Sequence, residues 1–383
     1  MRRFDHLASW EDYRRRSRRR LPRLLFDYIE GGASAETTLA ANRADFARLT
    51  LRPAVMRDVS TVDLRARLLG HDSAMPVMLG PVGSLGAFRR HGERAAFRAA
   101  AASGITACLS SFSIAPPEGL LDPMPAGHGF QLYVLRDRGR TAALLDRVAA
   151  AGFKTLVVTV DTAVSGVRER DIRNGLRRLT RPGPALLADF ATHPAWLLDM
   201  ARAHPLTMFL ARDWPDAGRG YMAQAAFLGG QIDASLGWSD LDWLRSHWSG
   251  RIVVKGVLTP EDAVQAVEGG ASGIVVSNHG GRQLDGAISS IQALPAIARA
   301  VGDRTEVLLD GGIRRGGDVV KALALGASGC LLGRAYVHAL VAGGEAGLTA
   351  WLATLKAEMT ATLALMGVTS IAALRAMGHD GLT

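Results

Sequence analysis

The stretch GIVVSNHGGRQLDGA, residues 273–287, joins an apolar run to a polar, glycine-rich segment. The run 273–276 is rich in β-branched residues and stops at polar residues, which predicts a buried β-strand. A turn after such a strand uses glycine, but it does not require His279 or Arg282. The stretch therefore predicts a buried strand whose carboxyl end carries functional side chains.

Similar apolar runs recur along the chain, separated by alanine-rich segments with a helical pattern such as 93–103 and 317–325. The predicted strands cover 75–80, 105–110, 130–134, 155–161, 252–256, 273–277, 307–310 and 329–333. Alternating βα units with continuously apolar strands predict an α/β fold, a closed (β/α)8 TIM barrel. An open, doubly wound sheet is the alternative, but the glycine fingerprint that usually follows its first strand is missing.

The remaining residues extend this barrel on both sides and in the middle. Residues 1–70 are predicted to form an N-terminal helical extension, 71–370 the barrel, and 371–383 a C-terminal tail. The segment 163–251, after the fourth strand, is far longer than a βα connection requires. It mixes arginines, among them Arg177, Arg178 and Arg181, with Trp196, 208–210 and Trp214. This composition suits either a lid over the barrel or an anionic membrane surface.

The composition is that of a globular protein with a large core, since 48% of the 383 residues are hydrophobic. No uncharged apolar run reaches the roughly 18 residues of a membrane-spanning helix. The two cysteines, Cys108 and Cys330, lie in strand-like runs, which predicts core thiols and a cytoplasmic protein. The net charge of +9 leaves open a different class of function, a non-catalytic basic scaffold on membrane or nucleic acid. The densest basic run, 14–20, fits a solvated helix better, and no nucleic-acid motif accompanies it, so we expect no nucleic-acid partner.

Polar residues gather at the carboxyl ends of the predicted strands, where barrels of this kind carry their chemistry. Lys255 interrupts an apolar strand, and a buried lysine must face a carboxylate or a ligand. The segments 310–317 and 332–334 each place glycine and arginine before a helix, a pattern that suits phosphate.

His279 is a candidate general base, with Asp161 available to orient its ring. Arg168 and Arg282 are candidates for holding a carboxylate by paired hydrogen bonds. No histidine or cysteine cluster has the spacing of metal ligands, so no metal site is predicted.

The segment Ser277–Asp285 resembles the signature of the FMN-dependent α-hydroxy-acid dehydrogenases and oxidases. The resemblance runs in order from about residue 10 to about residue 370. Further matching motifs are Phe26–Ala33, Gln131–Val134, Thr159–Asp161, Val254–Gly256, Asp310–Arg315 and Leu332–Arg334. The resemblance implies a TIM barrel, FMN as cofactor, a 2-hydroxy acid as substrate, and the homotetramer that is usual in the family.

The resemblance also implies a role for each matched position. His279 would take a proton from the substrate, Asp161 would stabilise the imidazolium, and Arg168 and Arg282 would hold the carboxylate. Tyr28 and Tyr133 would hydrogen-bond substrate oxygens. The resemblance leaves open loss of the carbon-bound hydrogen as hydride or as proton. The flavin ring and ribityl chain would contact Pro81, Val82, Gly83, Ser110, Gln131, Thr159, Lys255 and Ser277. The phosphate would contact Asp310, Gly311, Gly312, Arg314, Gly333 and Arg334.

Within the family, Val164–Asn174 and Gln231–Ser235 resemble the (S)-mandelate dehydrogenases, whereas Gln131–Gly139 and Thr192–Pro194 resemble the bacterial L-lactate dehydrogenases. Gly83 stands where many oxidases have alanine, which favours electron transfer to quinone. The favoured reaction is therefore oxidation of (S)-mandelate to benzoylformate, with L-lactate to pyruvate and an oxygen-using oxidase as alternatives. The insertion resembles the segment by which such dehydrogenases lie on the cytoplasmic face of the bacterial inner membrane, which implies peripheral association with an anionic membrane surface.

Overall fold

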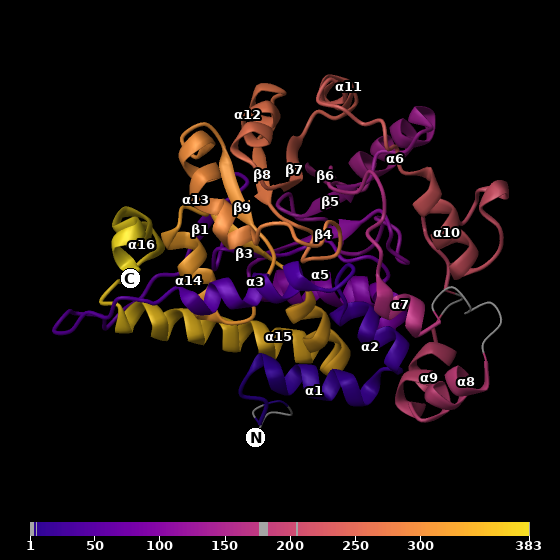
Figure 1. Cartoon of the computed structure of the whole chain (residues 1–383), viewed down its shortest axis with the longest axis horizontal. Coiled ribbons are helices and arrows are strands. Elements are labelled where there is room, and N and C mark those ends of the chain that lie inside the picture. The colour runs from indigo at the N-terminus through magenta and orange to yellow at the C-terminus, as the bar shows by residue number, and fades with distance from the viewer. Residues whose placement is uncertain (1–3, 5, 176–182, 204–205, 383) are drawn as a thin grey trace.

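Eight parallel strands close into a barrel in the computed structural model, which describes residues 4, 6–175, 183–203 and 206–382 (Figure 1). Each predicted strand is present, with bounds that differ by at most a few residues. The strands are β3 (Val77–Leu79), β4 (Thr106–Ser110), β5 (Gly129–Leu132), β6 (Thr155–Thr159), β7 (Arg251–Val257), β8 (Gly273–Val276), β9 (Glu306–Leu309) and β10 (Gly329–Leu332). Because β10 pairs with both β9 and β3, the sheet has no free edge and the predicted TIM barrel is confirmed.

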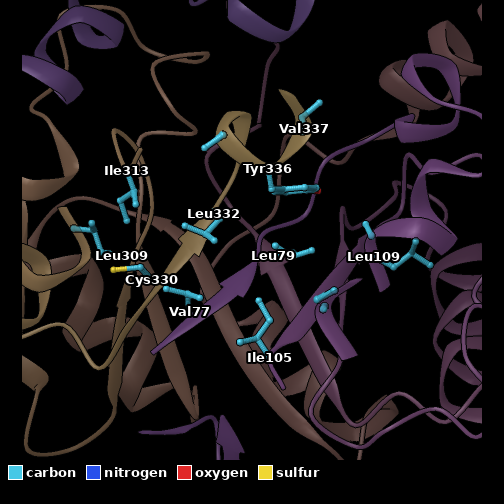
Figure 2. Packing of buried hydrophobic residues seen from close by; sticks show 14 of the residues in the cluster. Val77, Leu79, Ile105, Leu109, Leu309, Ile313, Cys330, Leu332, Tyr336 and Val337 are labelled. Atoms are coloured by element: carbon cyan, nitrogen blue, oxygen red, sulfur yellow. The ribbon is translucent and has the colours of Figure 1, made fainter. Parts of the chain in front are cut away.

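Helices follow the strands and cover the outside of the barrel. They include α4 (Leu85–Phe88), α5 (Gly92–Ala102), α6 (Arg138–Ala150), α12 (Pro260–Glu268), α13 (Ser290–Val301), α14 (Gly316–Ala324) and α15 (Arg334–Leu365). Outward-facing side chains such as Leu79 and Leu332 belong to the same buried cluster as Tyr336 and Val337 of α15 (Figure 2). The apolar strands are thus buried on their outer face by helices.

The inside of the barrel holds a separate apolar layer. Its members from the strands are Met78, Cys108, Val157, Val253, Val275, Leu308 and Leu331. Leu68 and Leu69 join the layer from a hairpin of β1 (Ala66–Leu68) and β2 (His71–Ser73), and they contact the positions where β10 and β8 begin. The hairpin therefore closes the amino-terminal end of the barrel. It was not expected, because residues 1–70 were predicted to be helical.

The N-terminal extension contains the predicted helices, α1 (Trp10–Arg20), α2 (Arg23–Glu30) and α3 (Thr37–Arg48). Helix α1 packs along α15, so the arginine run 14–20 is helical as predicted but solvated on one side only (Figure 1). Glu30 ties these elements together, since its carboxylate accepts hydrogen bonds from Arg14 at 2.8 Å and from His338 of α15 at 2.7 Å. At the other end of the chain, α16 (Ile371–Met377) and a short 3-10 helix, η3 (Gly378–Gly381), pack on α14.

The insertion consists of a packed part and an exposed part. Its helices are α7 (Glu169–Arg173), α8 (Pro184–Ala191), α9 (Pro194–Ala201), η2 (Pro215–Ala217), α10 (Tyr221–Gln231) and α11 (Asp240–His247). Met208 and Phe209 are buried in the main core, whereas α8 and α9 contain no fully buried residue and expose Leu187 and Leu198. Arg177, Arg178 and Arg181 lie outside the described residues. None of the described helices combines the length and the apolar character needed to cross a membrane.

Candidate active site

A polar layer lies directly above the apolar layer inside the barrel. Side chains along a strand alternate between its two faces, so the residue two positions after each interior residue also faces inward. These second positions are Gly80, Ser110, Thr159, Lys255, Ser277, Asp310 and Gly333. Gln131 lies opposite Ser110 in the β4–β5 register, and Thr159 lies opposite Lys255 in the β6–β7 register. The strand ends predicted to bind the cofactor therefore converge on one mouth.

Several polar atoms of this layer are buried without a partner among the described residues. They are Nε2 of Gln131, Oγ1 of Thr159 and Oδ1 of Asp310. Gln131 is nevertheless fixed, because its Oε1 accepts a hydrogen bond from Ser110 at 2.9 Å. Buried polar groups are normally hydrogen-bonded. Unpaired donors and acceptors at several strand ends of one mouth fit the polar edge of a planar ligand such as a flavin ring.

Lys255 is 4% exposed and lies at the centre of this layer. Its Nζ is 2.8 Å from Oδ2 of Asp310 and donates to Oγ of Ser277 at 2.9 Å. Burial alone would lower the pKa of Lys255, but the carboxylates of Asp310 and Asp161 outweigh it and raise the pKa. A permanent positive charge therefore stands at the barrel mouth. Asp310 was expected to contact a phosphate, and in the structure its carboxylate faces Lys255.

His279 and Asp161 meet across the ends of β8 and β6. Nδ1 of His279 lies 3.0 Å from Oδ1 of Asp161, and Gln283 donates to the backbone oxygen of Asp161 at 2.6 Å. Burial would raise the pKa of Asp161, but the charge and the hydrogen bond of His279 outweigh it, so the pKa is lowered. An ionised Asp161 accepts from Nδ1–H, so in the neutral form of the ring Nε2 of His279 is the proton acceptor. The contact that the sequence predicted between His279 and Asp161 is therefore present.

The predicted carboxylate-binding arginines surround Tyr28. The guanidinium carbons of Arg282 and Arg168 lie 4.8 and 5.5 Å from the centre of the Tyr28 ring. Arg282 also donates to the backbone oxygens of Tyr28 at 2.7 Å and Gly31 at 2.9 Å, and Arg168 pairs with Asp171 at 3.0 Å. The two cations are thus close together, and part of their hydrogen-bonding capacity is used by the protein itself.

Two further arginines, the buried Arg314 and the half-buried Arg334, lie at the same mouth without an ion pair among the described residues. Arg334 donates to the backbone oxygens of Ile29, Gly280 and Gly31, each at 2.8 Å. Burial and the neighbouring arginines lower the pKa of Arg334 to about 9, and burial lowers that of Arg314 to about 10. Buried cations are expected to face an anion. Their grouping beside the positive-φ residues Gly311 and Gly312 fits a phosphate group.

The remaining predicted residues line the same region. Pro81, Val82 and Gly83 follow β3 and are partly buried, and a Cβ at Gly83 would lie 3.0 Å from Cβ of Phe112. The ring of Phe112 packs edge-on against Tyr133 with centroids 5.2 Å apart. Burial, Asp161 and Tyr28 raise the pKa of Tyr133, which keeps its hydroxyl protonated and able to donate.

Three further residues, Gly256, Asn42 and Asn278, shape the site and were not among the predicted site residues. Gly256 has φ +111°, and a Cβ there would lie 2.7 Å from Cβ of Asp161, so glycine is required for this approach. Asn42 and Asn278 form a buried amide pair behind His279. Asn278 could have been predicted as a site residue, because it is polar, follows a buried strand and precedes His279. Asn42 lies in helix α3, where no sequence pattern marks it.

Known proteins resemble this chain over nearly its whole length. The family model described as FMN-dependent dehydrogenase matches residues 17–379. An L-lactate dehydrogenase of Caulobacter vibrioides is 49% identical over 96% of each chain, and one of Xanthomonas oryzae pv. oryzae is 46% identical over 97% of this chain and 95% of its own.

Solved structures agree with this match. The monotopic membrane protein (S)-mandelate dehydrogenase superposes with a TM-score of 0.93 at 38% identity, covering 99% of this chain and 100% of the other. A mandelate oxidase with bound (S)-4-hydroxymandelic acid gives a TM-score of 0.82 at 35% identity over 98% of both chains. The barrel, the buried cations and unpaired polar atoms at its mouth, and the end-to-end family match together show that the chain belongs to the FMN-dependent dehydrogenases, oxidoreductases that use FMN.

Proposed function

We propose that this enzyme oxidises an (S)-2-hydroxy acid to the 2-oxo acid and passes the electrons to a membrane quinone. The observation that carries the proposal is the His279–Asp161 pair, which lies at the mouth that also holds Arg168 and Arg282. An oriented base beside two guanidinium groups suits a substrate that has a hydroxyl next to a carboxylate.

In the proposed reaction, Nε2 of His279 accepts one proton from the substrate, and Asp161 stabilises the imidazolium that forms. Arg282 and Arg168 bind the carboxylate, and Tyr28 and Tyr133 donate to substrate oxygens. FMN, when bound, would supply the acceptor for the two electrons and for the second hydrogen that leave the substrate. Pro81 to Gly83, Ser110, Gln131, Thr159 and Ser277 would hold the flavin ring and ribityl chain, and Lys255 would place its charge where reduced flavin is negative. Gly311, Gly312, Arg314, Gly333 and Arg334 would hold the phosphate, while Asp310 would act through Lys255.

L-Lactate is the first proposed substrate, because the L-lactate dehydrogenases are more similar in sequence, at 46 to 49% identity. (S)-Mandelate is the second, because the mandelate dehydrogenase backbone superposes so closely. The test is to compare turnover with the two acids, using a soluble quinone analogue and oxygen in turn as acceptor. Faster turnover with L-lactate and quinone supports the first substrate, whereas faster turnover with mandelate supports the second. Efficient use of oxygen would contradict the quinone part of the proposal.

A second part of the proposal is that α8 and α9 dock the enzyme on an anionic membrane surface at the cytoplasmic face. Leu187, Leu197 and Leu198 are exposed on this helical pair. The pair is held beside the basic helix α1, since Arg20 lies 3.2 Å from Asp199 (Figure 1). An apolar surface next to arginines suits anionic lipid. The similar (S)-mandelate dehydrogenase is described as a monotopic membrane protein, which supports this reading.

Membrane docking is tested by Leu187→Asp together with Leu198→Asp, which should move the enzyme from sedimenting vesicles to the supernatant with FMN retained. Leu365→Asp is the matched control, because Leu365 is exposed at the end of α15 distant from α8 and α9 (Figure 1). Unchanged sedimentation of the double variant would contradict the docking surface. Deleting 178–215 is a poorer test, since it would remove Met208 and Phe209 from the core.

A homotetramer is also proposed from the resemblance, and light scattering of the holoenzyme tests it.

A further inference from the structure

Asn42 of α3 and Asn278, next to His279, form a reciprocal amide pair. Nδ2 of Asn42 donates to Oδ1 of Asn278 at 2.9 Å, and Nδ2 of Asn278 donates to Oδ1 of Asn42 at 2.8 Å. Both residues are nearly inaccessible, at 2% and 4% exposed. A paired amide of this kind is directional, since each side chain must present one donor and one acceptor in a fixed orientation. The pair, together with the hydrogen bond from Nδ2 of Asn278 to the backbone oxygen of Ile288 at 3.2 Å, fixes the orientation of Asn278 relative to a helix outside the barrel.

Asn278 holds the backbone on which His279 stands. Its Oδ1 also accepts from the backbone N–H of Gly281 at 3.0 Å. The side chain of Asn278 therefore spans the turn from residue 278 to residue 281. His279 has φ +57°, a left-handed conformation that costs free energy for a residue with a side chain. Such a conformation persists only where its surroundings impose it. The hydrogen bonds of Asn278 and that from the His279 N–H to Oγ of Ser277, at 3.0 Å, supply this constraint.

Asn42 also touches the neighbouring loop after β9. A Cβ at Gly312 would lie 2.0 Å from the backbone oxygen of Asn42, and one at Gly311 would lie 3.5 Å from Oδ1 of both Asn42 and Asn278. The same helix position therefore meets the loop that carries His279 and the loop of the proposed phosphate site. Asn42 thus lies against the two loops through its side chain at Asn278 and Gly311 and through its backbone oxygen at Gly312.

We propose that Asn42 is a positioning residue that acts through Asn278 to hold His279 in its left-handed conformation. This inference rests on the proposed function, in which His279 is the base. A small displacement of a base from its reactive geometry slows the chemical step strongly, while substrate binding by Arg168 and Arg282 is unaffected. Loss of Asn42 should therefore lower kcat without a matching change in KM.

The experiment uses the holoenzyme with Asn42→Ala, the milder Asn42→Ser, and Thr37→Val as matched control. Thr37 lies on the same helix and donates to Asp285 of the same loop at 2.7 Å, at an exposed position away from His279. We expect Asn42→Ala to retain FMN and to slow anaerobic flavin reduction by about 10-fold or more, with KM within about threefold. Thr37→Val should change the melting temperature alone. If Asn42→Ala fails to fold or to retain FMN, the same rate is measured on Asn42→Ser.

The variant Asn42→Asp adds a second readout. The introduced carboxylate cannot donate to Oδ1 of Asn278 while it is ionised, but it can donate once it is protonated. Flavin reduction by this variant should therefore recover relative to wild type as the pH falls. If the Asn42 variants lose thermal stability but reduce flavin at the wild-type rate, the positioning role is overturned. If wild type itself is not reduced by a 2-hydroxy acid, the proposed function has failed, which is a distinct result.

Discussion

Nδ1 of His279 lies 3.0 Å from Oδ1 of Asp161, although 118 residues separate them in the chain. The barrel makes this contact possible, because the carboxyl ends of β6 and β8 open at the same mouth on either side of β7. The contact leaves Nε2 of His279 free, and the buried carboxylate stabilises the charge that the ring acquires when it accepts a proton.

Replacing Asp161 by asparagine should slow the chemical step on the order of 100-fold, since the amide keeps the shape but not the charge. FMN content should be unchanged. The measurement is the limiting rate of anaerobic flavin reduction, with the flavin absorbance spectrum confirming occupancy. A rate within twofold of wild type would show that Asp161 does not stabilise the imidazolium.

The approach of Asp161 depends on Gly256, so Gly256→Ala should lower both stability and activity. The left-handed backbone disfavours any side chain, and the added Cβ would lie 2.7 Å from Asp161. A cost of about 1–3 kcal/mol is typical of such strain. The control is Gly230→Ala in α10, where a Cβ meets nothing within 4 Å and alanine favours the helix. Thermal unfolding compares the two, and equal melting temperatures would contradict the steric account.

Acid should destabilise the enzyme through the Glu30–His338 pair. Burial would raise the pKa of Glu30, but hydrogen bonds from His338 and Arg14 outweigh it and lower the pKa. A carboxylate whose pKa is lower in the folded than in the unfolded protein stabilises the fold at pH values above its unfolded-state pKa. This stabilisation is lost as the pH falls below about 4. Burial likewise lowers the pKa of His338, so its contribution begins to fall below a pH of about 6.5.

Glu30→Gln tests this linkage. The variant should be less stable than wild type by about 2 kcal/mol at pH 7, because a charged hydrogen-bond acceptor is lost. The difference should shrink towards pH 4, where wild type begins to lose the same contribution. The measurement is the melting temperature of wild type and of the variant at both pH values. A difference between the two proteins that is the same at both pH values would argue against Glu30 as the titrating group.

Removal of FMN should destabilise the protein mainly through the lost phosphate. The buried Arg314 and the half-buried Arg334 are cations that would then lose the phosphate they are proposed to face. Adding FMN at about 100 times its Kd should restore about 2.7 kcal/mol of stability. Riboflavin at the same concentration should restore less, because it lacks the phosphate. Arg314→Ala should reduce the difference between the two ligands, whereas Arg304→Ala, at an exposed position, should not. Equal stabilisation by FMN and riboflavin in wild type would contradict a phosphate site here.

The sequence predicted the barrel well because its strands are apolar on both faces, and such runs are visible without any structure. The converging polar layer was also predictable, since the carboxyl ends of parallel strands meet at one end of the barrel. The 66–73 hairpin was missed because its strands are three residues long and mostly polar. Asn42 was missed for another reason, because its partner Asn278 is 236 residues away and only the fold brings the two amides together. The pairing of Asp310 with Lys255 was likewise decided by register between strands, which composition does not reveal.

The most direct test is anaerobic bleaching of the bound flavin by L-lactate and by (S)-mandelate, in wild type and in His279→Ala. We predict that one of the two acids bleaches wild type within its turnover time, and that neither bleaches His279→Ala, whose FMN stays bound. Wild-type flavin that stays oxidised with both acids would contradict the proposed 2-hydroxy-acid chemistry. A His279→Ala variant that bleaches at the wild-type rate would contradict the assignment of His279 as the base.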